Sequence, residues 1–338
     1  MSLLRAVLVG AGGMGQAWAR AIANNADVAL VGWTDLFTER VAEGIEAIGL
    51  SDVGVEQDIE PALAKWSPDF VVDVAVPEAH HSITRYCLEH GVAVLGEKPM
   101  ATNLDEARDL VRVSERTSAL FVVSQNRRYN AGLEAFRLLA ADRLGGIGHL
   151  NAEFYRAPHF GGFREEMDSP LLIDMAIHTF DAARHVTGAD PVSVLCTEFN
   201  PPWSWYRGAA SAVVEFELTE QIRFSYEGSW CADGLETSWD SSWRAVGPLG
   251  SAKWDGTGNP VAEVRLPGDD AAAFERIEAG PATISGDGIA GSLADFVRAL
   301  RTGAVPMNEC HDNIKSFAMV TAAVESSRSG RRVALQVL

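Results

Sequence analysis

Polar residues in an otherwise apolar segment have the types and spacing needed for acid–base chemistry. Asp174, His178, Asp181 and His185 follow one another at intervals of four, three and four residues. At about 100° per residue, all four fall in a stripe roughly 60° wide on one face of a helix. An Asp174 carboxylate in contact with the His178 imidazole would orient the ring and raise its basicity. His178 is therefore a candidate general base near neutral pH.

Two other interpretations of this stripe are open. A polar stripe is often the solvated face of a helix, yet the rest of this segment is apolar, and buried Asp and His side chains need a reason. A metal site is the second alternative. An Asp-x3-His pair supplies only two ligands, and no third stands at a fixed spacing, so we expect no metal there.

A lysine that could stabilise charge on a substrate oxygen follows an apolar run at residues 92–95. The turn is Gly96-Glu97-Lys98-Pro99. If the run is a strand of an open parallel sheet, the turn lies at the carboxyl edge, where ligands bind. Pro99 keeps Lys98 out of the helical region, which would fix the turn. The alternative is a solvated lysine in a tight loop.

A glycine-rich turn is a candidate anion site. Gly10, Gly12 and Gly15 have the spacing G-x-G-x-x-G, between an apolar run that ends at Val9 and a helix-forming stretch from Gln16. The unpaired N–H groups and the dipole of a helix N-terminus would face a pyrophosphate here. Gly10 permits the sharp turn, Gly12 the approach of the pyrophosphate, and Gly15 the close packing of helix on strand.

Asp35 ends the next apolar run, 20 residues after Gly15. A carboxylate at this position can accept hydrogen bonds from a ribose diol, and it repels a 2′-phosphate, so NAD is favoured over NADP. The alternative is that Asp35 only caps the following helix. NADP stays open if an arginine such as Arg40 reaches the 2′-phosphate.

Weaker candidates follow two other apolar runs. Pro77, His80 and His81 come after residues 70–76 and would lie near the nicotinamide if the sheet binds a dinucleotide. Arg127 and Arg128 come after residues 120–124. They either line the cleft or are surface charges.

Strands and helices alternate in the first third of the chain, and this alternation must position these residues. The expected strands are 4–9, 28–34, 70–76, 92–95 and 120–124, and the expected helices are 14–24, 38–48, 59–66, 80–90 and 102–117. The pattern predicts an α/β domain with a doubly wound parallel sheet over residues 1–125.

Longer and more polar strands dominate residues 126–338. The expected strands are 149–155, 192–199, 209–218, 221–227, 236–246 and 332–338, the expected helices are 131–141, 171–186, 289–301 and 311–329, and long loops are expected in 256–288. This pattern predicts an α+β domain with a large, mostly antiparallel open sheet and helices on one face.

Composition limits the classes of partner. The 338 residues carry a net charge of −18, which disfavours nucleic acid and anionic membrane surfaces. The cysteines show no metal-ligand spacing and are expected to be small buried hydrophobes. They are Cys87, Cys196, Cys231 and Cys310. No signal peptide or apolar run of membrane-spanning length is visible, so a cytoplasmic location is expected.

Together these blocks resemble the Gfo/Idh/MocA oxidoreductase family, which includes glucose–fructose oxidoreductase and inositol dehydrogenases. The matching blocks are Gly10 to Gly15, Val76-Pro77-x2-His80-His81, Gly96-Glu97-Lys98-Pro99 and Asp174-x3-His178-x2-Asp181. The sequence departs from the family at Trp18, where many members have His, and at 168–171, where members usually have a glycine-rich turn. The second departure puts the placement of the substrate in doubt.

The resemblance implies an N-terminal Rossmann domain, a C-terminal domain with a large open sheet, and a cofactor held between them. It implies that the catalytic group is Lys98, Asp174 and His178. The residues expected to bind the cofactor are Gly10, Gly12, Gly13, Met14, Gly15, Asp35, Pro77, His81, Glu97 and Lys98. It also implies homodimers or homotetramers, often formed through the open face of the sheet.

The predicted activity is an NAD(P)-dependent dehydrogenase that acts on a sugar, polyol or related secondary alcohol. An alternative on the same scaffold is a glycosidase or lyase that uses bound NAD transiently, with no net redox change. A third is a dinucleotide-binding regulator without catalysis, against which the presence of Lys98, Asp174 and His178 argues.

Overall fold

The chain divides into two compact units. The computed structural model describes residues 2–267 and 273–335. The first unit comprises residues 1–126 and 285–314, and the second comprises residues 127–284 and 315–338. The first unit thus takes in a segment that follows most of the second unit in the chain.

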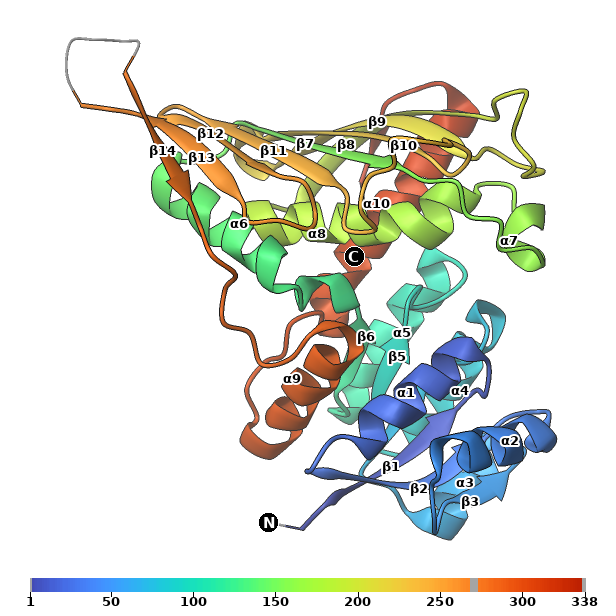
Figure 1. Cartoon of the computed structure of the whole chain (residues 1–338). Helices are drawn as coiled ribbons and strands as arrows, with labels where there is room; N and C mark the ends of the chain where they lie inside the picture. The colour runs from blue at the N-terminus through green and yellow to red at the C-terminus, as the bar shows by residue number, and fades with distance from the viewer. Residues whose placement is uncertain (1, 268–272, 336–338) are drawn as a thin grey trace. The chain divides into compact units, whose positions relative to one another are not determined.

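The first unit is built on a six-stranded parallel sheet, so the predicted doubly wound parallel sheet is confirmed (Figure 1). Its strand order is β3-β2-β1-β4-β5-β6. The strands are β1 (Leu4–Val9), β2 (Val28–Thr34), β3 (Gly54–Glu56), β4 (Phe70–Asp73), β5 (Ala93–Glu97) and β6 (Phe121–Ser124). The short β3 was not predicted, and β4 ends three residues before the predicted strand does.

The helices of the first unit follow the predicted ones closely. They are α1 (Gly13–Ala23), α2 (Thr38–Ile48), α3 (Ile59–Trp66), α4 (Pro77–Glu89), α5 (Leu104–Thr117) and α9 (Gly288–Thr302). The chain leaves β1 for β2 on one side and for β4 on the other, so the switch point of the sheet, where open α/β sheets bind ligands, lies at the carboxyl ends of β1 and β4. Trp18 and Trp33 are fully buried and anchor α1 and β2 in the core.

The second unit is built on a nine-stranded sheet that is mostly antiparallel, as predicted. Its order is β14-β13-β12-β11-β7-β10-β9-β8-β15, and only the β7–β10 pair is parallel among the pairs of the described residues. The strands are β7 (His149–Tyr155), β8 (Pro191–Phe199), β9 (Ser211–Leu218), β10 (Arg223–Ser229), β11 (Ser242–Gly247), β12 (Gly250–Trp254), β13 (Val261–Arg265), β14 (Phe274–Glu278) and β15 (Val333–Ala334).

Four predictions for this sheet need correction. The predicted strand 236–246 is β11, which begins only at Ser242. The segment 256–288, predicted as long loops, contains β13 and β14. β12 was not predicted, because Gly250 and the turn before it obscure the alternation. The predicted last strand, 332–338, is described only as β15, and residues 336–338 lie outside the described part of the chain.

Helices α6 (Ala131–Arg143) and α8 (Ile177–Thr187) lie along one face of the second sheet (Figure 1). Phe180 of α8 packs edge-on against Phe216 and Tyr226, with ring centroids 4.8 and 5.3 Å apart, and so fixes α8 on the sheet. The remaining helical segments are η1 (Asn126–Arg128), α7 (Phe163–Glu166), the π-helical turn η2 (Leu171–Ala176), η3 (Thr219–Gln221) and α10 (Cys310–Ser329).

The predicted helix 171–186 is therefore not a single α-helix, since its first part is a π-helical turn. Among the described residues, no helix combines the length and the apolar composition needed to cross a membrane.

Candidate active site

The glycine turn after β1 has the geometry that the spacing predicts. Gly10 has φ +98°, and a Cβ there would come within 2.5 Å of the Val74 carbonyl oxygen beyond β4. A Cβ on Gly15 would come within 2.1 Å of the Gly10 carbonyl oxygen. Both positions therefore exclude any side chain, and α1 packs directly on the turn.

The N-terminus of α1 is open to an anion. Gly12 is its N-cap and makes no side-chain capping bond, and the first turn contains no acidic residue. Gly12, Gly13 and Met14 are exposed, and no atom lies within 4 Å of a Cβ built on Gly12 or Gly13. Exposed N–H groups at a helix N-terminus without a competing carboxylate suit a pyrophosphate, so these residues fit the predicted dinucleotide.

Asp35 lies at the end of β2, beside this turn. Its Oδ2 accepts a 2.7 Å hydrogen bond from the Ala11 N–H, and its Oδ1 accepts one of 2.9 Å from the Phe37 N–H. The N-cap of α2 is Phe37, so Asp35 is not the helix cap of the alternative interpretation. A carboxylate oxygen has a second lone pair, so Asp35 can hold the turn and still accept from a ribose hydroxyl. Arg40 stacks on the Phe37 ring, 4.5 Å from its centroid.

Glu97 ends β5 at the same edge of the sheet, and Lys98 follows it. Glu97 is buried, and its Oε1 accepts a 2.7 Å hydrogen bond from Trp18 Nε1. Burial raises the pKa of the Glu97 carboxyl, although the Trp18 bond and the charge of Lys98 oppose the rise. Lys98 is only partly buried, and its peptide bond to Pro99 is cis. Trp18, the residue that departs from the family pattern, thus holds the glutamate next to Lys98.

His80 and Asp73 form a buried acid–base pair near Glu97. His80 Nδ1 lies 3.0 Å from Asp73 Oδ2, which also accepts a 2.9 Å bond from the Thr84 hydroxyl. Burial lowers the pKa of His80, but Asp73 and, more weakly, Glu97 outweigh this effect and raise it overall. The sequence did not single out Asp73 as a candidate residue, because it stands within an apolar run.

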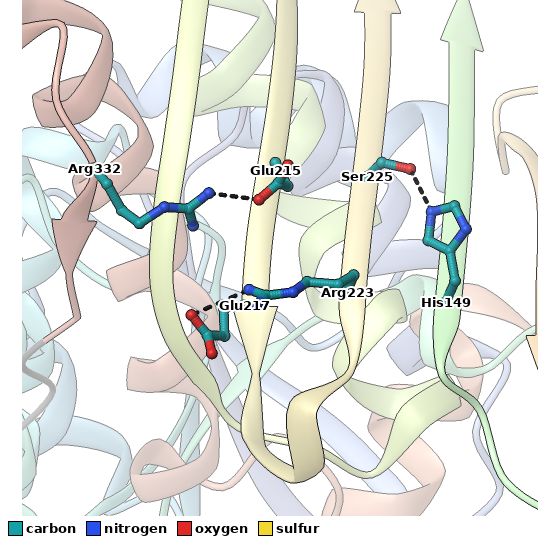
Figure 2. Close-up of a pocket in the computed structure, with 6 residues that line it drawn as sticks. All are labelled: His149, Glu215, Glu217, Arg223, Ser225 and Arg332. Atoms are coloured by element: carbon teal, nitrogen blue, oxygen red, sulfur yellow. Dashed lines mark hydrogen bonds and ion pairs between the residues drawn. The ribbon is translucent and has the colours of Figure 1, made fainter.

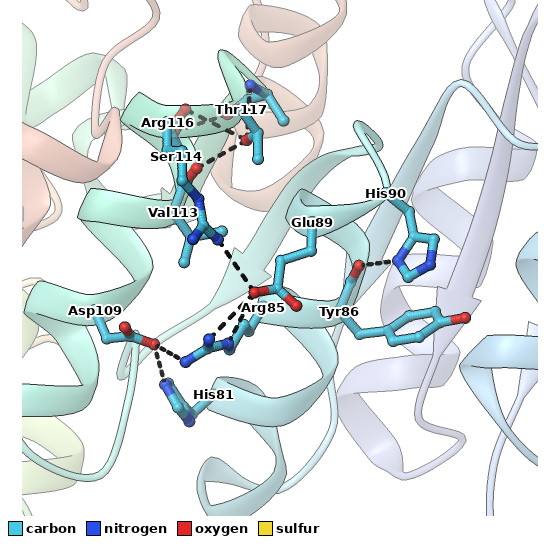
Figure 3. A network of polar contacts seen from close by, with 11 residues as sticks. His81, Arg85, Tyr86, Glu89, His90, Asp109, Val113, Ser114, Arg116 and Thr117 are labelled. Carbon is cyan, nitrogen blue, oxygen red and sulfur yellow. Dashed lines mark hydrogen bonds and ion pairs between the residues drawn. The ribbon is translucent and has the colours of Figure 1, made fainter.

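His81, predicted to bind the cofactor, contacts the neighbouring helix. Its Nε2 lies 2.9 Å from Asp109 Oδ2 on α5, and the same oxygen accepts from Arg85. Figure 3 shows this carboxylate between the two side chains, in a chain of ion pairs that continues through Glu89 to Arg116. These groups are partly exposed, so the network belongs to the surface of α4 and α5. Pro77 begins α4.

In the second unit, Asp174 lies in the π-helical turn and is anchored from outside the helix. Arg164 Nε of α7 donates a 2.6 Å hydrogen bond to Asp174 Oδ2. The Arg164 guanidinium also lies over the Phe160 and Phe163 rings. No pattern in the sequence pointed to Arg164, which stands in a short polar segment.

His178 and Asp181 are buried in α8, so the polar stripe is not the solvated face of a helix. Asp181 accepts two 2.7 Å bonds from Arg128 and one of 2.6 Å from the Ser316 hydroxyl. Arg128 is therefore a buried ion-pair partner, and the surface-charge interpretation of this residue is wrong. This ion pair fixes the face of α8 that carries His178.

Arg127 is also held inside the second unit. Its guanidinium donates to the Trp239 carbonyl oxygen and lies 3.4 Å from Met175 Sδ. Burial lowers the pKa of Arg127 to about 10, against the opposing charge of Asp240. Met175 stands next to Asp174, so Arg127 braces the π-helical turn.

Comparison with known proteins gives two adjoining matches. Residues 4–125 match the oxidoreductase family with an NAD-binding Rossmann fold, Gfo/Idh/MocA. Residues 138–335 match the C-terminal alpha/beta domain of the same family.

Individual relatives are distant. The chain is 31% identical to an inositol 2-dehydrogenase of Rhizobium meliloti over 193 residues, which cover 56% of this chain and 57% of that protein. It is 24% identical to a D-apiose dehydrogenase of Paraburkholderia graminis over 332 residues, which cover 91% and 84%. The fold is shared with an Agrobacterium radiobacter oxidoreductase crystallised with NAD+, L-tartaric acid and magnesium, at 20% identity, 98% coverage of each chain and a TM-score of 0.87.

Proposed function

Because the chain belongs to the Gfo/Idh/MocA oxidoreductase family, we propose that it transfers hydride between NAD and a secondary alcohol of a sugar, a polyol or a related compound. The observation that carries the proposal is the uncapped glycine turn beside the Asp35 carboxylate. The relatives named inositol 2-dehydrogenase and D-apiose dehydrogenase support the class of substrate.

The cofactor would be held by the first unit. The N–H groups of Gly12, Gly13 and Met14 would bind the pyrophosphate, and Asp35 would bind the adenosine ribose. Asp35 would also repel a 2′-phosphate, which supports NAD over NADP. Bound NAD supplies the acceptor for the hydride.

Three side chains would act on the alcohol. His178 takes the hydroxyl proton while the carbinol C–H leaves as hydride, so an alcohol and NAD+ give a carbonyl compound, NADH and protonated His178. Asp174, held by Arg164, stabilises the imidazolium that forms. The Lys98 ammonium stabilises the negative charge that develops on the substrate oxygen.

The first test is a panel of sugars and polyols with NAD and with NADP, followed by absorbance of the reduced cofactor. The proposal expects oxidation of at least one such alcohol, faster with NAD. Release of free sugar from glycosides with no accumulation of NADH would instead support the NAD-assisted glycosidase. NAD binding with no turnover on any substrate would support a regulator.

The open face of the second sheet is the proposed surface for homodimers or homotetramers. Every second residue of β7 from His149 to Tyr155, and of β9 from Val213 to Glu217, is exposed or partly exposed on this face. Figure 2 shows its charged part, where Arg332 pairs with Glu215, Arg223 with Glu217, and His149 with Ser225.

Exposed apolar side chains adjoin that charged part on β8 and β9. They are Leu195, Phe199 and Val213. A Val213→Glu variant is expected to lower the mass measured by light scattering. Val305→Glu, at an exposed position in the first unit, serves as the control.

A further inference from the structure

Three consecutive residues at the start of α10 bring different metal-binding atoms together. The Glu309 carboxylate, Cys310 Sγ and His311 Nδ1 all lie within 4.8 Å of one another. All three residues belong to the first unit. Glu309 forms an isolated antiparallel bridge with Val122, the second residue of β6, so the cluster lies toward the amino end of that strand, away from the carboxyl edge that carries the glycine turn.

The three donor atoms form a small triangle, with one carboxylate oxygen of Glu309 as a corner. Glu309 Oε1 lies 2.9 Å from Cys310 Sγ and 2.8 Å from His311 Nδ1, and Sγ lies 3.6 Å from Nδ1. Ligands of tetrahedral zinc, with bonds of about 2.0–2.3 Å, are separated by roughly 3.3–3.5 Å. The triangle needs to open by only about half an ångström on two edges to match these separations.

The backbone holds these donors in place. Glu309 precedes α10, and its carbonyl oxygen accepts the first helical bonds, from Asp312 and Asn313. Its Oε2 accepts a 3.0 Å bond from the His311 N–H. The carboxylate is therefore already ordered, so a bound cation would meet little further loss of side-chain entropy.

The second nitrogen of the histidine has the partner that metal-binding histidines usually have. His311 Nε2 lies 2.9 Å from Glu115 Oε1 on α5. A carboxylate on this side fixes the ring and the tautomer, and leaves Nδ1 for the metal. The thiol of Cys310, unlike the His311 ring, is fully buried. It lies beside the Glu309 carboxylate and makes no hydrogen bond to solvent.

We propose that Glu309, Cys310 and His311 form a binding site for one divalent cation of the zinc type, with water as the fourth ligand and Glu115 as the outer partner of His311. A thiolate, an imidazole and a carboxylate are the ligand types that zinc accepts together. The thiolate and the two carboxylates offset the charge of the cation. The bound metal would tie the start of α10 to α5 and β6. The prediction of no metal rested on the spacing of the cysteines and, separately, on the Asp174–His178 pair. It did not consider three consecutive residues of different ligand types.

The test is a titration of the untagged full-length protein, freed of metal with a chelator, with Co2+. We expect one equivalent to bind with a thiolate-to-cobalt charge-transfer band and the strong visible bands of a four-coordinate site, and Zn2+ to displace it. Absence of the band in the wild-type protein overturns the proposal.

Variants assign the ligands. Cys310→Ser should lose the charge-transfer band, and His311→Gln should weaken binding at least about tenfold. Glu115→Gln should weaken it about tenfold, since only the outer bond is lost. Cys87→Ser, at another buried cysteine of the first unit, is the matched control and should keep the band.

The glutamine variants keep the test valid if Cys310→Ser does not fold. The His311 and Glu115 side chains are 41% and 55% exposed, so neither change disturbs the core. A band that persists in Cys310→Ser, or cobalt affinities that are unchanged in both glutamine variants, contradicts the site.

Discussion

Trp18 Nε1 of α1 donates a 2.7 Å hydrogen bond to Glu97 Oε1 at the end of β5, and both side chains are buried. This bond joins the helix that begins at the glycine turn to the residue before Lys98. A neutral indole therefore stabilises a buried carboxylate at the centre of the proposed cofactor edge.

A Trp18→Phe variant should lower the free energy of unfolding by about 1–3 kcal/mol, because Glu97 loses its donor. Burial already raises the pKa of Glu97, and loss of the bond raises it further. A carboxyl with a raised folded-state pKa contributes stability below its unfolded pKa that is lost as the pH rises through the folded value. The defect should therefore be larger at about pH 8 than at about pH 5 in urea unfolding. The control is Trp18→Phe on a Glu97→Gln background, where the pH dependence should vanish; equal losses at both pH values would refute this account.

Gly12 and Gly15 should respond to alanine in opposite ways. A Cβ on Gly15 meets the Gly10 carbonyl oxygen at 2.1 Å, so Gly15→Ala should destabilise the protein by about 1–3 kcal/mol. A Cβ on Gly12 meets nothing within 4 Å, so Gly12→Ala should unfold like the wild type but bind NAD about tenfold more weakly. Calorimetry and NAD titration check both. Unchanged NAD affinity in Gly12→Ala would argue against the pyrophosphate site.

Asp35→Asn should reduce the preference for NAD. The amide keeps the shape and one acceptor for the Ala11 N–H, but it no longer repels a 2′-phosphate. We expect the ratio of kcat/KM for NAD to that for NADP to fall about tenfold or more, equivalent to about 1.4 kcal/mol. Steady-state kinetics with each cofactor measure it, and an unchanged ratio would remove Asp35 from the ribose site.

His178→Ala should lose 10²–10⁴-fold in kcat, roughly 3–5 kcal/mol, if His178 is the general base. NAD affinity should not change, since the proposed nucleotide site lies in the other unit. His185→Ala is the matched control on the same helix, where the ring instead contacts Glu134 at 2.9 Å. Normal turnover by His178→Ala would exclude the assignment.

Asp181→Asn should destabilise the second unit by about 3–5 kcal/mol, because it leaves the Arg128 charge buried without its bidentate partner. Denaturant unfolding measures the loss. Arg128→Met combined with Asp181→Leu should cost less than Asp181→Asn, since no unpaired charge stays behind. The opposite order would mean that the pair itself, rather than its desolvation, dominates.

Local signals were enough to predict five of the six strands of the first sheet and its glycine turn. Buried parallel strands are short apolar runs, and the turn after β1, with a φ of +98° at Gly10, requires glycine. The apolar runs and the glycine spacing can therefore be recognised without knowledge of the fold. β13 and β14 were missed because they lie in a stretch rich in Gly, Pro, Ala and Asp that is typical of loops. The two strands pair with each other as neighbours in the chain, but both are short and largely exposed, so neither shows a clear alternation of apolar and polar residues.

The residues that support the site were harder to predict than the site residues themselves. Arg164 reaches Asp174 from a separate short helix, and Trp18 reaches Glu97 across 79 positions of sequence. The π-helical turn at Asp174 depends on its tertiary surroundings rather than on an apolar period. The neighbouring histidines His80 and His81 look equivalent in the sequence. Only the structure shows that His80 is buried against Asp73 while His81 faces α5.

The path of the chain has a practical consequence for engineering. The polypeptide enters the second unit after residue 126, returns to the first for residues 285–314, and leaves it again within α10. No single truncation of the chain can therefore yield either unit intact. A chimera that keeps the first unit and replaces the second must exchange two separate segments, 127–284 and 315–338. It must also keep α9, which completes the core of the first unit.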